Sequence, residues 1–162
     1  MIRALMLFLA VAVAAAPAIF VPQPAESVVP GGVDRIVFVS DRDDPQGEIY
    51  TRDFVGGEWT RLTSNTAQEA RPVWSPDGTK IAYQSTASGY WDIWVMGTDG
   101  SNPQRLTSDP AADVSPDWSP DGTKITYASC ASGSWDVWAM GADGSSRVNL
   151  TPTAGSTETS PA

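Results

Sequence analysis

The sequence predicts an all-β fold made of β-propeller blades, each with four antiparallel strands, and it encodes about three such blades. The octapeptide WSPDGTKI occurs twice, at 74–81 and 118–125, and residues 72–107 match residues 116–151 at 24 of 36 positions without a gap. The pair Leu-Thr recurs three times at the same 44-residue spacing, at 62–63, 106–107 and 150–151. Repeats of roughly 40 to 45 residues, rich in strand-forming and turn residues, are typical of propeller blades.

The second repeat shows how one blade is built. Four strands are expected in it, at 71–75, 80–85, 91–96 and 104–107. Ser-Pro-Asp-Gly joins the first two as a tight turn, because Pro fixes φ and Gly accepts a positive φ. In the third strand apolar residues alternate on both sides, Ile93 and Val95 on one and Trp94 and Met96 on the other. A strand of this kind lies in a sheet that is covered on both faces by other sheets.

The other two repeats follow the same order. In the third, strands are expected at 117–119, 124–129, 135–140 and 147–151. In the diverged first repeat they are expected at 35–40, 48–50 and 59–63, and the leading strand around 27–29 is missing or degenerate. The repeat region is therefore 34–162, with blades at about 34–63, 70–107 and 114–151.

An acidic residue followed three positions later by Pro precedes the WSPDG turns. Glu69 and Asp113 begin such segments, and Glu158 begins one more, which predicts the stub of a further first strand at 158–162. Propellers typically have four to eight blades, and three blades leave two apolar faces exposed. Two explanations remain open: a homodimer that completes a ring, or a fragment truncated from a longer protein, which the abrupt end after the stub favours.

The N-terminus has the pattern of a signal peptide. A basic start at 1–3 precedes an apolar run at 4–16, and Ala16-Pro17-Ala18 fits a cleavage site. Residues 1–18 are therefore expected to be removed, with Ala25 as a second possible cleavage position, and 19–33 to form a linker. The alternative is an uncleaved membrane anchor. Cleavage predicts an exported protein, periplasmic or extracellular, without a membrane span in the mature chain.

Composition excludes several classes of function. The chain has 10 Lys and Arg against 19 Asp and Glu, a net charge of −9, and its only lysines are Lys80 and Lys124, so no basic cluster is present to bind nucleic acid. It has no histidine, which excludes histidine-based catalysis and metal ligation. The single cysteine, Cys130, is expected to be a half-buried loop residue, or alternatively to form an intermolecular disulfide.

These motifs resemble the TolB-type β-propeller repeat, which is sometimes described as WD-repeat-like. The resemblance rests on Leu-Thr, the acid-x-x-Pro segment, WSPDGTKIAY, Asp-Ile-Trp-Val-Met and x-Asp-Gly, and it covers about 34–162. It implies a six-bladed ring in an exported, extracytoplasmic setting. The family's namesake works in the Tol–Pal system of the bacterial cell envelope, binds protein partners, and carries an N-terminal α/β domain that this sequence lacks. Similar repeats occur in propellers of exported peptidases and of sugar-binding or sugar-cleaving proteins.

The candidate binding face lies at one end of the blades, where the longer and more varied loops meet. We call it the loop face, and it consists of 41–47, 63–71, 86–90, 107–115 and 130–134. Glu69, Arg71 and Asp113 are expected there as a mixed-charge rim that can hold a peptide carboxylate or amine; the alternative is solvated charges that pair with each other. Tyr90, where the third repeat has Ser134, is expected to stack on a sugar or anchor a protein, or to pack beneath its own loop.

The loop at 41–48 concentrates carboxylates. Asp41, Asp43, Asp44 and Glu48 lie within eight residues and make a weak candidate calcium site, although their spacing is not that of an EF-hand. An acidic, solvent-exposed turn is the default interpretation. No other cofactor is indicated.

The sequence contains no catalytic constellation such as Gly-x-Ser-x-Gly, a Gly-rich phosphate loop or Cys-x-x-Cys. We therefore expect a non-enzymatic propeller module that binds proteins in the cell envelope. A carbohydrate-binding or carbohydrate-cleaving propeller, and a truncated fragment without activity of its own, are the alternatives.

Overall fold

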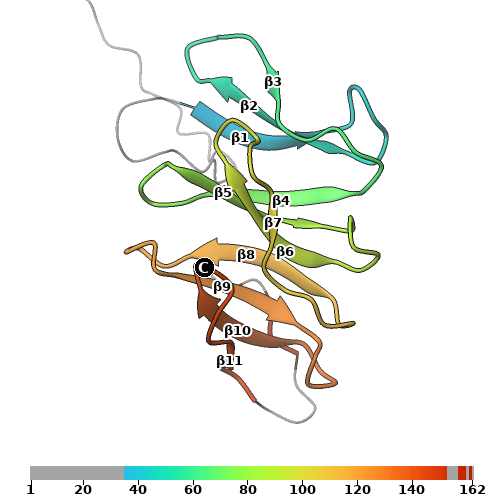
Figure 1. Cartoon of the computed structure of the whole chain (residues 1–162), viewed down its shortest axis with the longest axis vertical. Helices are drawn as coiled ribbons and strands as arrows, with labels where there is room; N and C mark the ends of the chain where they lie inside the picture. The colour runs from blue at the N-terminus through green and yellow to red at the C-terminus, as the bar shows by residue number, and fades with distance from the viewer. Residues whose placement is uncertain (1–34, 153–156, 160, 162) are drawn as a thin grey trace, which may run out of the picture.

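Three antiparallel sheets lie one below another in the computed structural model, which describes residues 35–152, 157–159 and 161 (Figure 1). Within each sheet, strands that follow one another in the sequence are hydrogen-bonded neighbours, as in propeller blades. The predicted all-β fold class, with three blades, is confirmed. The described part of the chain contains no helix with the length and hydropathy needed to cross a membrane.

We call the sheets blade 1, blade 2 and blade 3 in chain order. Blade 1 contains β1 (Arg35–Ser40), β2 (Glu48–Asp53) and β3 (Thr60–Arg61). Blade 2 contains β4 (Glu69–Trp74), β5 (Lys80–Ser85), β6 (Asp92–Gly97) and β7 (Gln104–Arg105). Blade 3 contains β8 (Asp113–Trp118), β9 (Lys124–Ser129), β10 (Asp136–Gly141) and β11 (Val148–Asn149).

Several predictions lie outside the described residues. They are the signal peptide at 1–18, the linker at 19–33 and the leading strand around 27–29. Of the predicted stub at 158–162, only 158, 159 and 161 are described, and none of these three is in a strand.

The strands β1, β5 and β9 begin and end where the sequence predicts. The turn before β5 explains its sharp start, because the Ser75 hydroxyl donates to Asp77 Oδ1 at 2.6 Å and accepts the Lys80 N–H at 2.9 Å. Ser119 and Asp121 repeat the first contact before β9, also at 2.6 Å. The repeated octapeptide is thus a closed turn that fixes the register of the following strand.

The first strands of blades 2 and 3 begin earlier than predicted, at Glu69 and at Asp113. A bulge interrupts the pairing of both strands. Within these bulges Arg71 has a φ of 48° and Ser115 a φ of 57°, in the left-handed region. Because a bulge breaks the alternation of side chains, the sequence pattern reveals only the part of the strand that follows it.

The Leu-Thr pair holds the outer edge of each blade. In every blade the Leu N–H donates at 2.8 Å to the carbonyl of the second residue of β2, β6 or β10. The Thr hydroxyl accepts the N–H of that same residue at 2.8 or 2.9 Å. The pairs are Leu62-Thr63 with Ile49, Leu106-Thr107 with Ile93, and Leu150-Thr151 with Val137. The hydroxyl extends the strand ladder by one bond and so fixes the Leu side chain.

Apolar side chains fill the two junctions between blades. Between blades 1 and 2 the buried residues are Ile49, Trp74, Ile81, Tyr83 and Met96. Between blades 2 and 3 they are Ala82, Ile93, Val95, Leu106, Trp118, Ile125, Tyr127 and Met140. Blade 2 is therefore covered on both faces, as the two-sided pattern of its third strand predicted. Trp94 and Trp138 are half-buried against these clusters, and Trp74 and Trp118 are buried in them.

A glycine of the following blade lies against a leucine of the preceding blade in each junction. A Cβ on Gly100 would lie 2.6 Å from the Leu62 carbonyl oxygen, and a Cβ on Gly144 would lie 3.0 Å from the Leu106 carbonyl oxygen. Both glycines also have a positive φ, of 82° and 85°. Only glycine combines this backbone conformation with such a close approach. We call this contact the Gly–Leu junction.

Replacing Gly100 with alanine is expected to lower the free energy of unfolding by about 1 to 2 kcal/mol more than replacing Gly89 with alanine. The two glycines have positive φ values of 82° and 98°, so the backbone penalty is shared. A Cβ on Gly89 would meet nothing within 4 Å, whereas one on Gly100 would overlap the Leu62 backbone. Urea unfolding of both variants measures the difference. Equal losses would show that the junction does not constrain Gly100.

Candidate functional site

Hydrogen bonds between neighbouring blades hold the loop face together. The Asp113 N–H donates to the Trp91 carbonyl at 2.8 Å, and the Glu158 N–H donates to the Trp135 carbonyl at 2.8 Å. Each of these bonds joins the acid-x-x-Pro segment of one repeat to the start of the third strand of the repeat before it. These bonds connect the loop face to the junctions between the blades.

The strands β2, β6 and β10 each begin with a buried carboxylate. Glu48 pairs with Arg61 at 2.6 Å and Asp92 pairs with Arg105 at 2.9 Å. In blade 3 Asn149 stands at the place of these arginines, and its side-chain amide donates to Asp136 at 2.9 Å. The three carboxylates have side chains that are at most 1 % exposed. Each carboxylate ties its strand to the last strand of the same blade, which is β3, β7 or β11.

A second set of buried carboxylates begins the first strands of blades 2 and 3. One Glu69 oxygen accepts the Asn65 amide and the Ser85 hydroxyl, each at 3.0 Å. Its other oxygen accepts no hydrogen bond of ordinary geometry from the described residues, and neither does either oxygen of Asp113, although the Ser129 and Thr107 hydroxyls lie near Asp113. Because Asn65 also donates its backbone N–H to Glu48 at 3.2 Å, the carboxylates of the two sets lie close together at the junction.

Burial changes the ionisation of this second set. It raises the pKa of Glu69 above its ordinary value, against the hydrogen bonds from Asn65 and Ser85. Burial also raises the pKa of Asp113 to about 6, although nearby hydroxyls favour its ionised form and the charges of Asp109 and Asp92 disfavour it. Asp113 therefore keeps its proton to a higher pH than an exposed aspartate does.

The structure places the predicted binding residues in two groups. Glu69 and Asp113 are 2 % and 1 % exposed, so they lie beneath the loop face and do not form the expected mixed-charge rim. Arg71 is exposed on the first bulge, and no ion pair or hydrogen bond of its side chain is observed among the described residues. Tyr90 is 55 % exposed, so its ring is open to a ligand and is not packed beneath its loop.

The predicted calcium loop is not assembled as a metal site. Asp43 accepts the Tyr50 hydroxyl at 2.5 Å, Asp44 accepts the Gln46 N–H at 2.9 Å, and Glu48 is paired with Arg61. Asp41 is exposed. Over the described ranges, no three acidic or cysteine side chains come together in a way that would hold a metal ion. The loop is instead fixed by its own hydrogen bonds.

Cys130 lies in the loop face as a half-buried free thiol. Its sulfur accepts the Ala112 N–H at 3.3 Å, and its own N–H donates to the Ala112 carbonyl at 3.3 Å. The predicted half-buried position of this small loop residue is confirmed.

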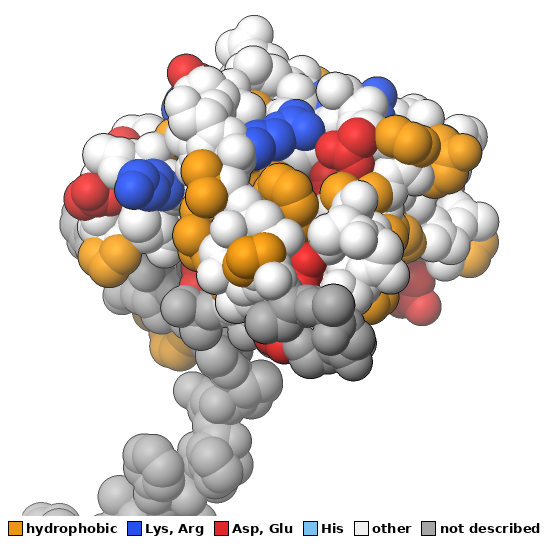
Figure 2. All heavy atoms as spheres, turned by 90° about the horizontal axis from the view of Figure 1, so that it is seen from below, with side chains coloured by type: hydrophobic (Ala, Val, Ile, Leu, Met, Phe, Trp, Pro, Cys, Tyr) orange, Lys and Arg blue, Asp and Glu red, His pale blue; other side chains and the backbone are white. Residues whose placement is uncertain are grey.

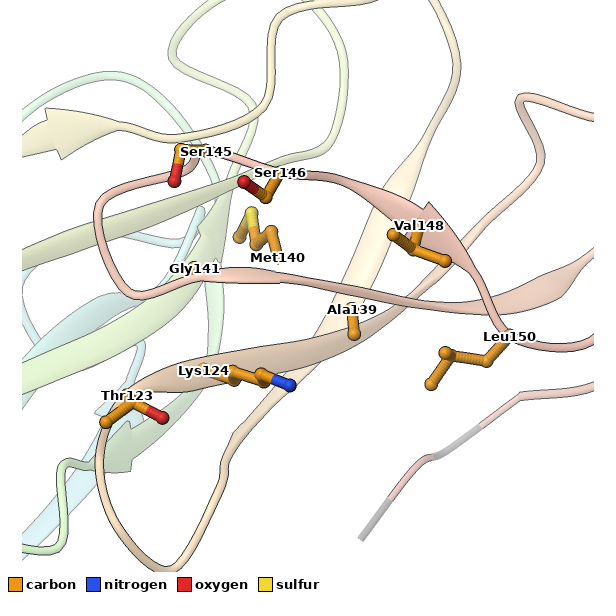
Figure 3. Close-up of a pocket in the computed structure, with 9 residues that line it drawn as sticks. All are labelled: Thr123, Lys124, Ala139, Met140, Gly141, Ser145, Ser146, Val148 and Leu150. Atoms are coloured by element: carbon orange, nitrogen blue, oxygen red, sulfur yellow. The ribbon is translucent and has the colours of Figure 1, made fainter.

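A hollow of about 510 Å³ lies in blade 3 at the end opposite the loop face. It is next to the turn between β8 and β9 and the turn between β10 and β11 (Figure 3). Lys124 and Ala139 line it from β9 and β10, and Leu150 closes it on one side. Blade 2 has a hollow of about 320 Å³ at the corresponding residues, among them Lys80 and Val95. Because the same hollow recurs one repeat earlier, it belongs to the architecture of the blade.

The sequence analysis named Glu48, Glu69 and Asp113 but placed them on the surface, and it did not identify Asp92, Asp136 or the partners Arg61 and Arg105. One signal for them was present: acidic residues recur at the same place in each repeat, as Glu48, Asp92 and Asp136 and as Glu69, Asp113 and Glu158. A charge that is kept in register with core residues marks a position inside the repeat rather than on its surface.

Comparison with known proteins gives one family and several similar structures. Residues 22–162 match the family model described as the TolB beta propeller domain. The Tol-Pal system protein TolB of Desulfosudis oleivorans is 38% identical over 61 residues, which cover 38% of this chain and 14% of that protein. The structure of putative TolB from Agrobacterium tumefaciens has a TM-score of 0.71 and 29% identity, and covers 80% of this chain and 49% of that one.

The crystal structure of TolB from Acinetobacter baumannii has a TM-score of 0.69 and 24% identity, over 80% of this chain and 32% of that one. At this identity the likeness shows the fold. The chain spans about half or less of the length of each of these three proteins.

Proposed function

Since the chain belongs to the TolB beta propeller domain family, we propose that it is an exported, non-enzymatic binding module whose loop face binds a protein of the cell envelope. The observation that carries the proposal is the exposure of Arg71, on the bulge of β4, and of Tyr90, on the loop before β6. Export is supported by the signal-peptide pattern at 1–18.

Each exposed residue suits a different part of a protein ligand. The Arg71 guanidinium presents five N–H donors in a planar fork, which matches a partner's carboxylate. The Tyr90 ring offers an apolar surface with a polar hydroxyl, and such residues are enriched at the centres of interfaces. The partner is therefore expected to present an acidic and an apolar side chain to the same surface.

Blade 3 supplies matched substitutions for testing this proposal. It has Ser115 where blade 2 has Arg71, with a similar φ of 57° against 48°, and Ser134 where blade 2 has Tyr90. Arg71→Ser and Tyr90→Ser therefore remove the two side chains and introduce the residue that blade 3 has at the same positions. Asn102→Ser is the control, because Asn102 is exposed at the opposite end of blade 2 and its counterpart is Ser146, with a φ of 55° against 51°.

Immobilised full-length chain is expected to retain a protein from the envelope fraction of the source cells after chemical crosslinking. Tyr90→Ser and Arg71→Ser are each expected to weaken binding of the purified partner by about 10-fold, and Asn102→Ser to leave it unchanged. Binding constants from titration calorimetry test this. The proposal fails if no envelope protein is retained, or if all three variants bind equally well.

A further inference from the structure

The Gly–Leu junction leaves one glycine and one leucine without a counterpart among the described residues. Leu62 and Leu106 are covered by Gly100 and Gly144 of the following blades. Leu150 is the equivalent leucine of blade 3, and its side chain is 53 % exposed where that of Leu106 is 5 % exposed. By analogy with the first two junctions, a third junction would place the glycine of a turn against Leu150.

The turn that would fit over Leu150 is present in blade 1. Gly56 has a φ of 99° and donates its N–H to the Asp53 carbonyl at 3.1 Å, as Gly100 and Gly144 donate to the residue three positions before them at 3.0 and 2.8 Å. Its surroundings are open, since among the described residues the only atom within 4 Å of a Cβ placed there belongs to the flexible Arg52 side chain. Gly56 thus has the turn conformation of a junction glycine, but among the described residues no leucine lies against it.

The side chain beside this glycine is exposed in the same way. Thr98 in blade 2 and Ala142 in blade 3 are half-buried, and Ala142 packs against the core between blades 2 and 3. Phe54 holds this position in blade 1 and is 58 % exposed. Val55, the next residue, is 90 % exposed, but its counterparts Asp99 and Asp143 are also exposed. Of the two apolar residues, only Phe54 corresponds to a junction position.

The outer face of blade 3 is an open junction surface. The hollow in this blade reaches Leu150, whereas the hollow in blade 2 stops short of Leu106, which blade 3 covers. Viewed from the end of the molecule that blade 3 occupies, apolar side chains gather near the middle of the surface (Figure 2). Ala139 and Leu150 stand where Val95 and Leu106 stand in the filled junction.

The open surfaces also carry complementary charges. Strand register places Asp117 of blade 3 at the position of Val73, because these residues pair with Thr126 and Ala82 respectively. Register likewise places Arg52 of blade 1 at the position of Met140.

Val73 and Met140 belong to one apolar cluster, from opposite sides of the junction between blades 2 and 3. On the open surface of blade 3 the acid Asp117 takes the place of Val73. On the open surface of blade 1 the base Arg52 takes the place of Met140. An acid on one surface and a base on the other favour pairing of these two surfaces over pairing of either surface with itself.

We propose that blade 3 of one copy of this chain binds blade 1 of a second copy, and that two copies close into a ring of six blades. Leu150 then meets Gly56 and Phe54 of the second copy, and Asp117 meets Arg52. The Glu158 N–H already occupies the position from which the first strand of a following blade starts. Blade 1 has only three strands in the described part of the chain, so the dimer would bring the unpaired edge of β1 in the second copy toward that position. Both junctions are identical by two-fold symmetry.

Light scattering after size-exclusion chromatography of the full chain, expressed with its own N-terminal segment, is expected to give the mass of a dimer. Asp117→Arg and Arg52→Asp are each expected to weaken dimerisation by about 100-fold, since each places like charges in both junctions. An equimolar mixture of the two variants is expected to recover dimers, because one mixed junction is the wild-type pair and the other is the reversed pair.

A second pair of substitutions tests the Gly–Leu contact. Leu150→Asp is expected to give monomers, because it places a charge where Leu106 is buried in the filled junction. Val55→Asp is the control and is expected to leave the dimer intact, since Asp99 and Asp143 occupy this position beside filled junctions. Circular dichroism of each variant checks that the blades are folded.

Three results would overturn the proposal. The first is a monomer at concentrations up to roughly 100 μM, which would leave the face to a different occupant such as a further blade of a longer chain. The second is a dimer that survives both charge reversals. The third is an assembly that grows with concentration without a limiting mass, which would show that the ends do not close.

Discussion

Replacing Leu106 with alanine is expected to lower the free energy of unfolding by about 3 kcal/mol. Its side chain is 5 % exposed and belongs to the core cluster between blades 2 and 3, together with Ile93 and Trp118. The backbone of Leu106 is held to Ile93 on one side and approached by Gly144 on the other, so neither neighbour can move to fill the cavity. Urea unfolding followed by tryptophan fluorescence measures the loss.

The matched control is the same substitution one repeat later. Leu150→Ala is expected to cost less than about 1 kcal/mol in the separated chain, because more than half of the Leu150 side chain is exposed to water. In the proposed dimer the cost of Leu150→Ala grows toward that of Leu106→Ala, so it should increase with protein concentration. A small loss for Leu106→Ala would show that the junction between blades 2 and 3 adds little stability.

The repeat makes the architecture predictable from the sequence. Strands β5 and β9 are predicted to the residue because the Ser and Asp side chains of the preceding turn close it independently of the rest of the blade. The two-sided apolar pattern of the third strand is equally local, and the structure confirms it in the burial of Ile93 and Met96 on opposite faces. Features that depend on neighbours along the chain are visible in one sequence.

Features that depend on contacts between blades were not predicted. Glu69 and Asp113 read as surface charges, because nothing in a linear pattern shows that the preceding blade covers them. The bulges at Arg71 and Ser115 hid the first half of their strands for a related reason, since a left-handed residue before proline interrupts the alternation on which strand prediction rests. Of the candidate binding residues, Arg71 and Tyr90 are exposed; Tyr90 was chosen because the third repeat has Ser134 in its place, a difference that one sequence shows.

The same distinction explains why Leu-Thr and Asp-Gly recur in phase. Leu106 and Gly144 are 38 positions apart, yet the structure places them in one contact, and the contact recurs between Leu62 and Gly100 at the same separation. Each residue bonds within its own blade, but the close contact between leucine and glycine exists only when another blade is stacked beside it. The stability of such an array comes from the interfaces between neighbouring repeats as much as from the repeats themselves.

Replacing Asp113 with asparagine is expected to stabilise the protein near pH 8 by about 2 kcal/mol more than it does near pH 4. Burial raises the pKa of this carboxyl to about 6 in the folded state, above the value near 4 expected in the unfolded chain. The folded state therefore holds the proton more tightly. As the pH rises from about 4 to about 6, the unfolded state loses its proton first, and the free energy of unfolding falls.

Above about pH 6 both states are ionised and the penalty is constant. The full change from near 4 to about 6 corresponds to about 3 kcal/mol, and we expect about 2 because water at the adjoining loops screens part of the charge. Asparagine keeps the shape and removes the charge, so the variant lacks the penalty. Urea unfolding of variant and wild type at the two pH values gives the difference without the contribution of other carboxylates.

Asp121→Asn provides a control of opposite sign. The Ser119 hydroxyl, followed by the Thr123 N–H and hydroxyl, lowers the pKa of exposed Asp121 to about 2, so its ionised form supports the fold. That support is present above pH 4 and is lost as the pH falls toward 2, so Asp121→Asn removes it at neutral pH. A stability difference for Asp113→Asn that does not change with pH would show that Asp113 is hydrated in the folded state.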